Sequence, residues 1–86
     1  MFRVIVHRKA LGKINSMLAK DKRRVLDALK AMGSDPFSGD VKPIKGLRGV
    51  FRRRVGDYRV AFTVNFGASE VVVLKVGRRE KFYAEI

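Results

Sequence analysis

Arginine is concentrated in the segment VFRRRVGDYRVAF, residues 50–62, whose other residues are typical of a β-sheet. Four of the eight positions 52–59 are arginine. A guanidinium stays charged at physiological pH, and its planar fork of N–H donors matches the oxygens of phosphate or carboxylate. The chemistry that these residues suit is therefore anion binding and charge stabilisation, and not proton abstraction.

Gly56 and Asp57 predict a two-residue hairpin turn in the middle of this segment. In that register Arg54 lies directly opposite Arg59, and directly paired residues project to the same side of a sheet. Side chains alternate along each strand, so the hairpin has two distinct faces. The apolar face, expected to lie toward helices, carries Phe51, Val55, Tyr58, Val60, Phe62, Val64 and Phe66. The opposite face carries Arg52, Arg54, Arg59, Ala61, Thr63 and Asn65.

Two arginines that face each other across strands repel, at a cost of some tenths of a kcal/mol to about 1 kcal/mol. An anion between them would replace this repulsion with charge-assisted hydrogen bonds, so the pair favours an anion-binding face over a merely solvated one. Lys75 and Arg79 share the parity of this face if the last strand continues through Gly77. Arg53 falls on the apolar side, and we expect it near a sheet edge with its charged head in water.

Composition narrows the function further. The chain has 86 residues, which predicts a single domain over residues 1–86. It has no cysteine and one histidine, so we expect neither a metal site nor a cofactor. A net charge of +12 indicates a polyanionic partner, either nucleic acid or an acidic protein. Without a signal peptide or a membrane-spanning segment, we expect a cytoplasmic protein with no membrane partner.

The remaining sequence predicts the elements that position the basic face. Residues 2–6 are expected to form a strand, and residues 34–49, with both prolines, an irregular connection with turn glycines. Between them we expect two helices, the second capped by Asp21 and ended by Gly33. Their apolar stripes are Ala10, Leu11, Ile14, Met17 and Leu18, then Val25, Leu26, Leu29 and Met32.

Three further strands are expected at 50–55, 58–66 and 70–77. The predicted fold class is α+β in the order β-α-α-β-β-β, with an N-terminal strand, an antiparallel helical hairpin and a three-stranded antiparallel meander. The helices would cover one face of the sheet and leave the basic face open.

These motifs resemble the RelE/ParE superfamily of bacterial and archaeal type II toxins, and most closely its RelE branch. The resemblance spans nearly the whole chain: the helical hairpin, LRGVFRRRVGDYRVAF, a valine-rich strand and the terminal VGRREKFY. The combination of RVGDYR with a later G-R-R-x-x-x-Y is specific. The resemblance implies a toxin that cleaves mRNA in the ribosomal A site without a metal and is inhibited by an acidic, RelB-like antitoxin.

Carried over residue by residue, the resemblance assigns catalytic roles to Arg52, Arg54, Arg59, Arg79 and Tyr83. In the family these positions grip the scissile phosphate region, neutralise transition-state charge and assist proton movement. The RelE branch can carry lysines at the places of the first two, and arginine is a poor general base, so Tyr83 is the candidate for proton transfer or base stacking. The candidate RNA-binding residues are Lys45, Arg48, Lys75, Arg78 and Lys81.

Other readings remain open. His7 is expected to cap a helix or lie on the surface, and Glu80 to pair with Arg78 or Lys81. A ParE-like member would poison DNA gyrase and cleave no RNA, and a third alternative is a non-catalytic nucleic-acid-binding module. The antitoxin is expected on the helical hairpin or across the basic face.

Overall fold

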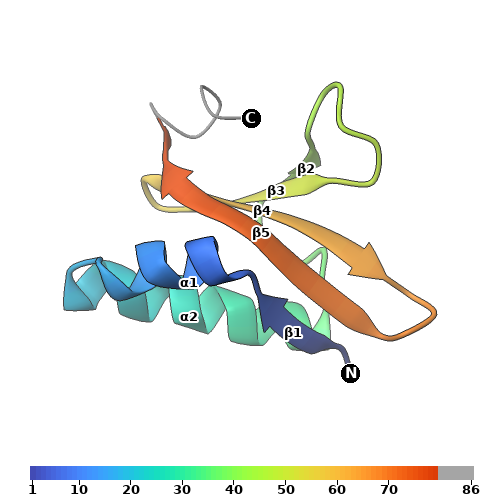
Figure 1. Ribbon diagram of the computed structural model, residues 1–86, viewed down its shortest axis with the longest axis horizontal. Helices are drawn as coiled ribbons and strands as arrows, with labels where there is room; N and C mark the ends of the chain where they lie inside the picture. Colours follow the sequence, from blue (N-terminus) through green and yellow to red (C-terminus); the bar gives the residue numbers. More distant parts are fainter. Residues whose placement is uncertain (80–86) are drawn as a thin grey trace.

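Residues 1–79, which the computed structural model describes, form two helices and a five-stranded sheet (Figure 1). The elements in chain order are β1 (Arg3–Val6), α1 (Arg8–Asn15), α2 (Ala19–Ser34), β2 (Val41–Pro43), β3 (Phe51–Val55), β4 (Tyr58–Asn65) and β5 (Glu70–Arg78).

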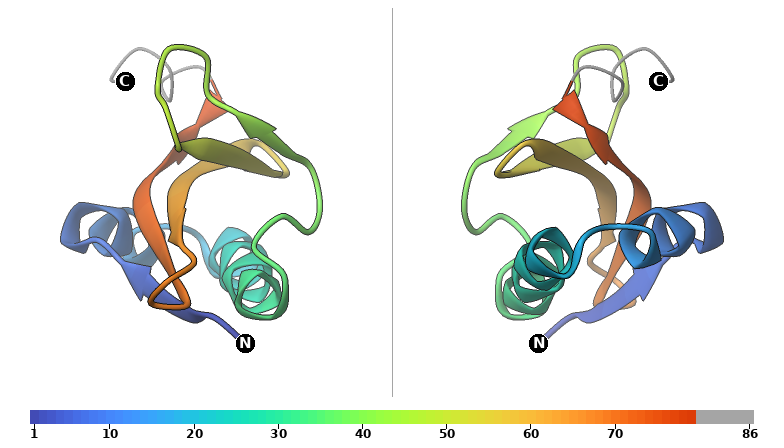
Figure 2. Two further views of the ribbon diagram at one scale, coloured as in Figure 1. Left: turned by 90° about the vertical axis from the view of Figure 1, so that its right-hand side faces the viewer. Right: turned by 90° about the vertical axis from the view of Figure 1, so that its left-hand side faces the viewer.

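The sheet has the strand order β1-β5-β4-β3-β2. β1 runs parallel to β5, and every other neighbouring pair is antiparallel. Both helices lie on one side of this twisted sheet, and the loop between β2 and β3 rises on the other side (Figures 1 and 2). The predicted α+β class and the placement of the helices are therefore confirmed.

One strand, β2, is missing from the sequence-based prediction, which treated residues 34–49 as an irregular connection. The meander therefore has four antiparallel strands and not three. β2 is too short to show an alternating pattern, and its Pro43 lacks an N–H donor, which suits only the edge of a sheet. The glycines of this stretch do act as turn residues: Gly39, Gly46 and Gly49 all have positive φ.

The helix boundaries differ partly from the prediction. His7 caps α1 as expected, because its Nδ1 accepts a hydrogen bond from the backbone N–H of Lys9 at 3.3 Å. α2 begins at Ala19, and its N-cap residue is Leu18, which makes no capping hydrogen bond through its side chain. Asp21 lies inside the first turn, where its negative charge still favours the helix dipole. The prediction that it caps the helix was wrong.

Gly33 lies within α2, and the prediction that it ends the helix was also wrong. Its carbonyl accepts a hydrogen bond from the backbone N–H of Phe2 at 2.7 Å. A Cβ atom at this position would stand 3.3 Å from the Phe2 carbonyl oxygen. Glycine here allows β1 to approach the end of α2 closely, so the constraint on this residue is tertiary and leaves no local signal.

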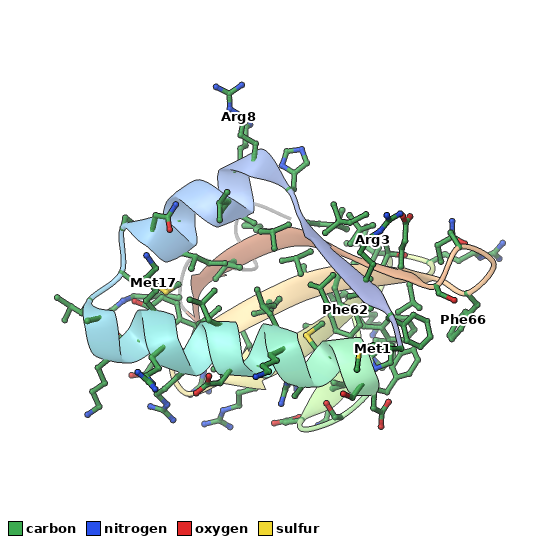
Figure 3. All side chains as sticks on the ribbon, turned by 90° about the horizontal axis from the view of Figure 1, so that it is seen from below. Met1, Arg3, Arg8, Met17, Phe62 and Phe66 are labelled. Carbon is green, nitrogen blue, oxygen red and sulfur yellow. The ribbon has the colours of Figure 1, made fainter. Side chains whose placement is uncertain are left out.

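The core fills the space between the helices and the sheet. Figure 3 shows Phe62 in this layer and Phe66 at the turn after β4. Phe66 is 65% exposed, although its parity predicted burial, because β4 ends one residue before it. The fully buried large side chains are Phe62, Ile14, Met32, Val25, Val60, Val71 and Val73.

Three leucines that were predicted to belong to the buried helical stripes are exposed. Leu11, Leu18 and Leu26 retain 45%, 76% and 43% of their accessible surface. Each helix packs against the sheet with only the central part of its apolar stripe, so residues at the margins of the stripe remain exposed to solvent.

Arg53 crosses from the sheet to the helices. Its guanidinium donates a 2.6 Å hydrogen bond to the backbone carbonyl of Ala28 in α2, and its Nε is buried without a hydrogen-bond partner among the described residues. This burial lowers the pKa of Arg53. Arg53 as a whole is half-buried, so the expectation that its head reaches water holds only in part: α2 lies over β3 and binds one side of the guanidinium. A Cβ on Gly39 would stand only 2.6 Å from one of its nitrogens.

The Arg53 guanidinium makes Gly39 more sensitive to substitution than Gly46. Both have positive φ, but a Cβ at Gly46 would meet no atom within 4 Å. We expect Gly46→Ala to cost about 1 kcal/mol from backbone strain alone. Gly39→Ala should cost about 1 kcal/mol more, because the Arg53 guanidinium must shift and weaken its hydrogen bond.

Urea unfolding of the two variants measures this difference. The excess cost at Gly39 should disappear when both substitutions are repeated in an Arg53→Ala background. An excess that persists in that background would contradict the described packing of Arg53.

Candidate functional site

The β3–β4 hairpin has the predicted register. Gly56 and Asp57 form the turn, Gly56 has a φ of +59°, and Arg54 pairs directly with Arg59. Arg52 pairs with Ala61, so the three predicted arginines belong to the same face of the sheet. We call the sheet face turned away from the helices the open face, and its residues around the hairpin are Arg52, Arg54, Arg59, Ala61 and Lys75.

Arg59 is nevertheless buried, with 6% of its surface exposed. Its guanidinium donates to the backbone carbonyls of Tyr58 at 3.1 Å and Gly56 at 3.4 Å. The side chain therefore bends back toward the hairpin turn and satisfies its donors there. Burial of a charged side chain requires such partners, and the turn supplies them. Parity correctly predicted the face of Arg59 but not the position of its charged end.

Arg52 is held by an acidic residue of the connection before β2. Its guanidinium contacts the Asp40 carboxylate at 3.2 Å and lies 3.4 Å from the Asp40 carbonyl oxygen. The Arg52 side chain is 14% exposed, whereas that of Asp40 is 47% exposed. The Asp40 carbonyl also accepts a 2.9 Å bond from the Arg54 backbone N–H. Sequence reasoning missed Asp40, because its proximity depends on the pairing of β2 with β3, which was not predicted.

Arg54 differs from its neighbours because its side chain is exposed and makes no hydrogen bond or ion pair within residues 1–79. It lies across from the buried Arg59 and on the same face as Arg52. Of the three hairpin arginines described on this face, Arg54 is therefore the one available to an incoming anion without giving up a partner.

β5 contributes to the open face as predicted, with one irregularity. The β4–β5 register shifts after Ala61, which pairs with Lys75, while Phe62 pairs with Val73, so Leu74 forms a bulge. Lys75 shares the open face with Ala61.

The end of β5 separates two candidate arginines. Arg79 follows β5, and its backbone N–H donates to the Asp57 carbonyl at 2.9 Å, which places it beside the hairpin turn. Arg78 pairs with Tyr58 and lies over its ring, with the guanidinium carbon 5.7 Å from the ring centroid. Arg78 therefore belongs to the helix side, although it is a candidate RNA-binding residue.

The loop between β2 and β3 borders the open face. Ile44 and Val50 pack against Ala61, forming a small second apolar cluster, and the Thr63 hydroxyl donates to the Gly49 carbonyl at 2.8 Å. The open face is therefore partly covered, contrary to the expectation of a wholly free surface. Lys45 and Arg48 are exposed on this loop. Tyr83 and Lys81 lie outside the described residues, as does Glu80.

In the described part of the chain no group of histidine, aspartate or glutamate side chains is arranged to hold a metal ion. Neither helix of residues 1–79 is long and apolar enough to cross a membrane. Among the described residues, the carboxylate that forms an ion pair with a hairpin arginine is that of Asp40. The arrangement can bind an anion and offset negative charge.

Comparison with known proteins identifies the class. The family model for the ParE toxin of the type II toxin–antitoxin system parDE matches residues 4–83. A curated protein of Methanocaldococcus jannaschii named "Putative toxin RelE1" is 25% identical over 85 residues, covering 95% of this chain and 94% of that protein.

Solved structures agree with this match. The RelE–RelB complex of Pyrococcus horikoshii contains a chain that is 28% identical, with a TM-score of 0.79 over 91% of this chain and 94% of that one. The complex RelBE2 of Mycobacterium tuberculosis contains one with a TM-score of 0.80 and 22% identity over 91% of this chain and 98% of that one, which bears on the fold alone.

The fold and the family match define a toxin of a type II toxin–antitoxin system. The chain belongs to the ParE toxin family, within the RelE/ParE superfamily, and the resemblance seen in the sequence is confirmed.

Truncation of the two paired arginines should change the free energy of unfolding by different amounts. Arg59→Ala should lower the free energy of unfolding by about 1–3 kcal/mol, because it removes a buried side chain whose guanidinium bonds two turn carbonyls. Arg54→Ala should change it by no more than about 0.5 kcal/mol, or raise it slightly, because it removes an exposed charge that faces a like charge.

Urea unfolding at low and high salt separates the two effects. Equal losses of stability in both variants would show that Arg59 is not anchored to the turn as described.

Proposed function

We propose that this toxin is a ribosome-dependent mRNA endonuclease that works through a metal-free basic site. The observation that carries the proposal is the register of the hairpin, which puts Arg52, Arg54 and Arg59 on one face beside Lys75. Like charges directly opposite each other cost folding free energy, and a phosphate bound at this face would remove that cost.

The proposed reaction is attack by a ribose 2′-hydroxyl on the adjacent phosphate. The O2′–P bond forms, the bond from phosphorus to the 5′-oxygen of the next nucleotide breaks, and the 2′-proton must leave while the departing oxygen gains one. Negative charge grows on the phosphate oxygens during this step. Fixed guanidinium donors that are already oriented stabilise that charge without reorganising.

The structure suggests different tasks for the three arginines. Arg54, which is exposed, would contact the phosphate first. Arg52 is oriented by Asp40, and it would exchange that exposed carboxylate for a phosphate oxygen. The Arg59 guanidinium already donates hydrogen bonds to carbonyls of the turn. Its contribution would therefore be a positive electrostatic potential near the phosphate and a more rigid hairpin. In this proposal Arg59 acts through position and charge more than through direct contact.

Proton movement is assigned to Tyr83 and further charge stabilisation to Arg79. Arg79 follows β5 directly and is tied by its backbone to the hairpin turn, which places it near the same end of the face. Lys45 and Arg48, on the bordering loop, would contact the RNA backbone, as would Lys75 and, beyond the described residues, Lys81. The ribosome would orient the mRNA, which supplies the proximity that this small site lacks.

The proposed inhibitor is an acidic, RelB-like antitoxin. The solved relative from Pyrococcus horikoshii is named as a complex of RelE with RelB. The net charge of +12 favours fast, electrostatically guided association with an acidic partner.

Gyrase inhibition is the second candidate, and the match to the ParE toxin model favours it. The two functions predict different damage in cells: truncated mRNA for an endonuclease, and broken DNA for a gyrase poison. Mapping RNA 5′ ends and DNA breaks after induction therefore separates them.

Cleavage of ribosome-bound mRNA by purified variants tests the assigned roles. Arg54→Ala, Arg79→Ala and Tyr83→Phe should each reduce the single-turnover rate by about 100-fold or more, the typical loss for one transition-state group. Arg23→Ala, which removes an exposed charge from α2, is the matched control and should retain the wild-type rate. Wild-type rates in all four variants would refute the catalytic assignment.

A further inference from the structure

The proposed RNA cleavage needs two proton transfers, one away from the ribose 2′-hydroxyl and one to the departing 5′-oxygen. These two oxygens stand on opposite sides of the phosphorus, so one tyrosine cannot serve both in the same step. The arginines of the hairpin stay protonated at physiological pH and accept no further proton. The reaction therefore needs a separate proton acceptor beside the open face.

Asp40 lies at the edge of this face. Val41 pairs with Arg53, and the Arg54 backbone N–H donates to the Asp40 carbonyl at 2.9 Å, so the β2–β3 register continues by one residue. Asp40 is therefore opposite Arg54, and directly paired residues project to the same side of a sheet. On that side the Asp40 carboxylate contacts the Arg52 guanidinium at 3.2 Å.

The charged groups that β2 and β3 place around this carboxylate are cations. Arg52 and Arg54 belong to β3. Lys42, two residues further along, pairs with Arg52 and shares its face. The Arg53 guanidinium lies against the glycine that precedes Asp40. Asp40 is thus a single carboxylate set among the cations that would attract a phosphate.

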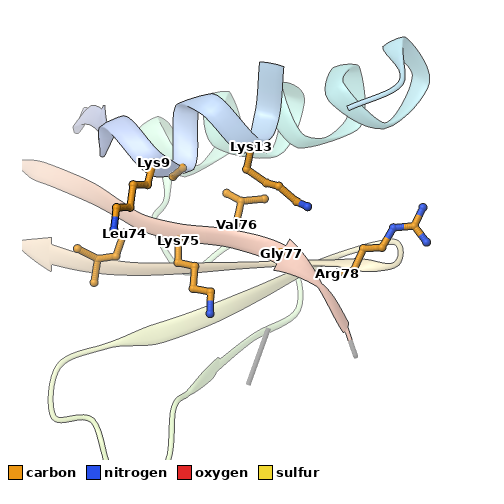
Figure 4. A pocket seen from close by; sticks show the side chains of 8 residues that line it. Lys9, Lys13, Leu74, Lys75, Val76, Gly77 and Arg78 are labelled. Atoms are coloured by element: carbon orange, nitrogen blue, oxygen red, sulfur yellow. The ribbon is translucent and has the colours of Figure 1, made fainter. Parts of the chain in front are cut away.

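Other groups that could accept a proton lie elsewhere or lack a lone pair. Lys9 and Lys13 extend from α1 on the helix side of β5 (Figure 4). Lys75 points away from α1, toward the open face, but an ammonium group has no acceptor. The Nδ1 of His7 already caps α1. Asp57, in the hairpin turn, forms no ion pair with a hairpin arginine among the described residues.

The carboxylate of Asp40 can move without disturbing the sheet. Its backbone is fixed by the hydrogen bond from Arg54, whereas its side chain is held by Arg52 and is 47% exposed. The Arg52 side chain is only 14% exposed, so the carboxylate is the member of the pair that reaches solvent. Rotation of the Asp40 side chain therefore carries the carboxylate from Arg52 toward a bound ligand.

We propose that Asp40 is the proton acceptor of this site, an inference that rests on the proposed function. Without RNA, Arg52 holds the carboxylate in an ion pair, and a carboxylate paired in this way is a weak base. When Arg52 turns to the phosphate, the carboxylate is released beside it. The negative charge of the phosphate then favours proton uptake by the carboxylate. Substrate binding thus converts a structural ion pair into a base.

The bonds and protons of the step balance. The Asp40 carboxylate takes the proton of the 2′-hydroxyl as the O2′–P bond forms. The bond from phosphorus to the 5′-oxygen breaks, and Tyr83 gives that oxygen a proton. The products are a 2′,3′-cyclic phosphate and a 5′-hydroxyl. Asp40 is left protonated and Tyr83 deprotonated, and both are restored by exchange with water.

The pH dependence of cleavage separates a proton acceptor from a residue that merely positions Arg52. In single-turnover cleavage of ribosome-bound mRNA, Asp40→Asn should lower the rate by about 100-fold or more near neutral pH. The loss should shrink as the pH rises, because hydroxide can replace the missing carboxylate. Asp40→Glu keeps a carboxylate and should recover part of the rate. A loss that is constant with pH, or a wild-type rate in Asp40→Asn, would overturn the proposal.

Binding of an RNA that cannot react separates catalysis from affinity. Asp40→Asn should bind ribosomes carrying a 2′-O-methyl mRNA at least as tightly as the wild type, because it removes a negative charge that competes for Arg52. Weaker binding that accounts for the whole loss of rate would contradict a role in proton transfer. Asp27→Asn, which neutralises an exposed carboxylate of α2, is the matched control and should keep the wild-type rate and pH profile.

An mRNA with sulfur in place of the bridging 5′-oxygen distinguishes the two proton roles. A thiolate leaves without a proton, so this substrate should restore the rate of Tyr83→Phe but not that of Asp40→Asn. Restoration in Asp40→Asn would assign Asp40 to the leaving group and refute the proposal. If Arg54→Ala abolishes cleavage and Asp40→Asn does not, this inference alone fails. If the wild type cleaves no mRNA, the proposed function fails with it.

Discussion

The register of one hairpin is the constraint on which the rest of this structure depends. The two-residue turn at Gly56 and Asp57 sets Arg54 opposite Arg59, and the alternation of side chains then fixes which face every residue of β3 and β4 occupies. A shift of one residue would move the arginines into the core and Phe62 into solvent. The large apolar side chains of β4 therefore stabilise the same arrangement that brings like charges together.

The fold resolves this crowding of charge by giving each arginine a different environment. Arg53 bonds to a carbonyl of α2, Arg59 bonds to the carbonyls of the turn, and Arg52 is paired with Asp40. Only Arg54 of the four stays exposed without such a partner in the described region. The hairpin thus separates arginines that shape and stiffen the site from the one that is available to an incoming anion.

Sequence reasoning predicted what local patterns determine. The alternation of side chains along the strands correctly predicted that Phe62 and Val60 are buried in the core and that Arg54 belongs to the other face of the sheet. The Gly–Asp turn correctly predicted the register of β3 with β4. Sequence reasoning failed where the environment of a residue depends on a segment that is distant in the sequence. Gly33 allows close contact with β1, and Asp40 lies near Arg52 only because β2 pairs with β3. Arg53 finds a hydrogen-bond acceptor because α2 crosses β3. No pattern in a short stretch reports such contacts, which is why the faces were predictable and the partners of the charged groups were not.

The central claim is that RNA binds the open face of the sheet, and mapping the contact by NMR tests it most directly. A short 2′-O-methyl RNA lacks the attacking hydroxyl, so it should bind without being cleaved. The account predicts that its amide and guanidinium shift changes concentrate on Arg52, Arg54 and Lys75, with the outer surface of α2 unaffected. Shift changes confined to the helices, with the arginines of β3 unchanged, would contradict it.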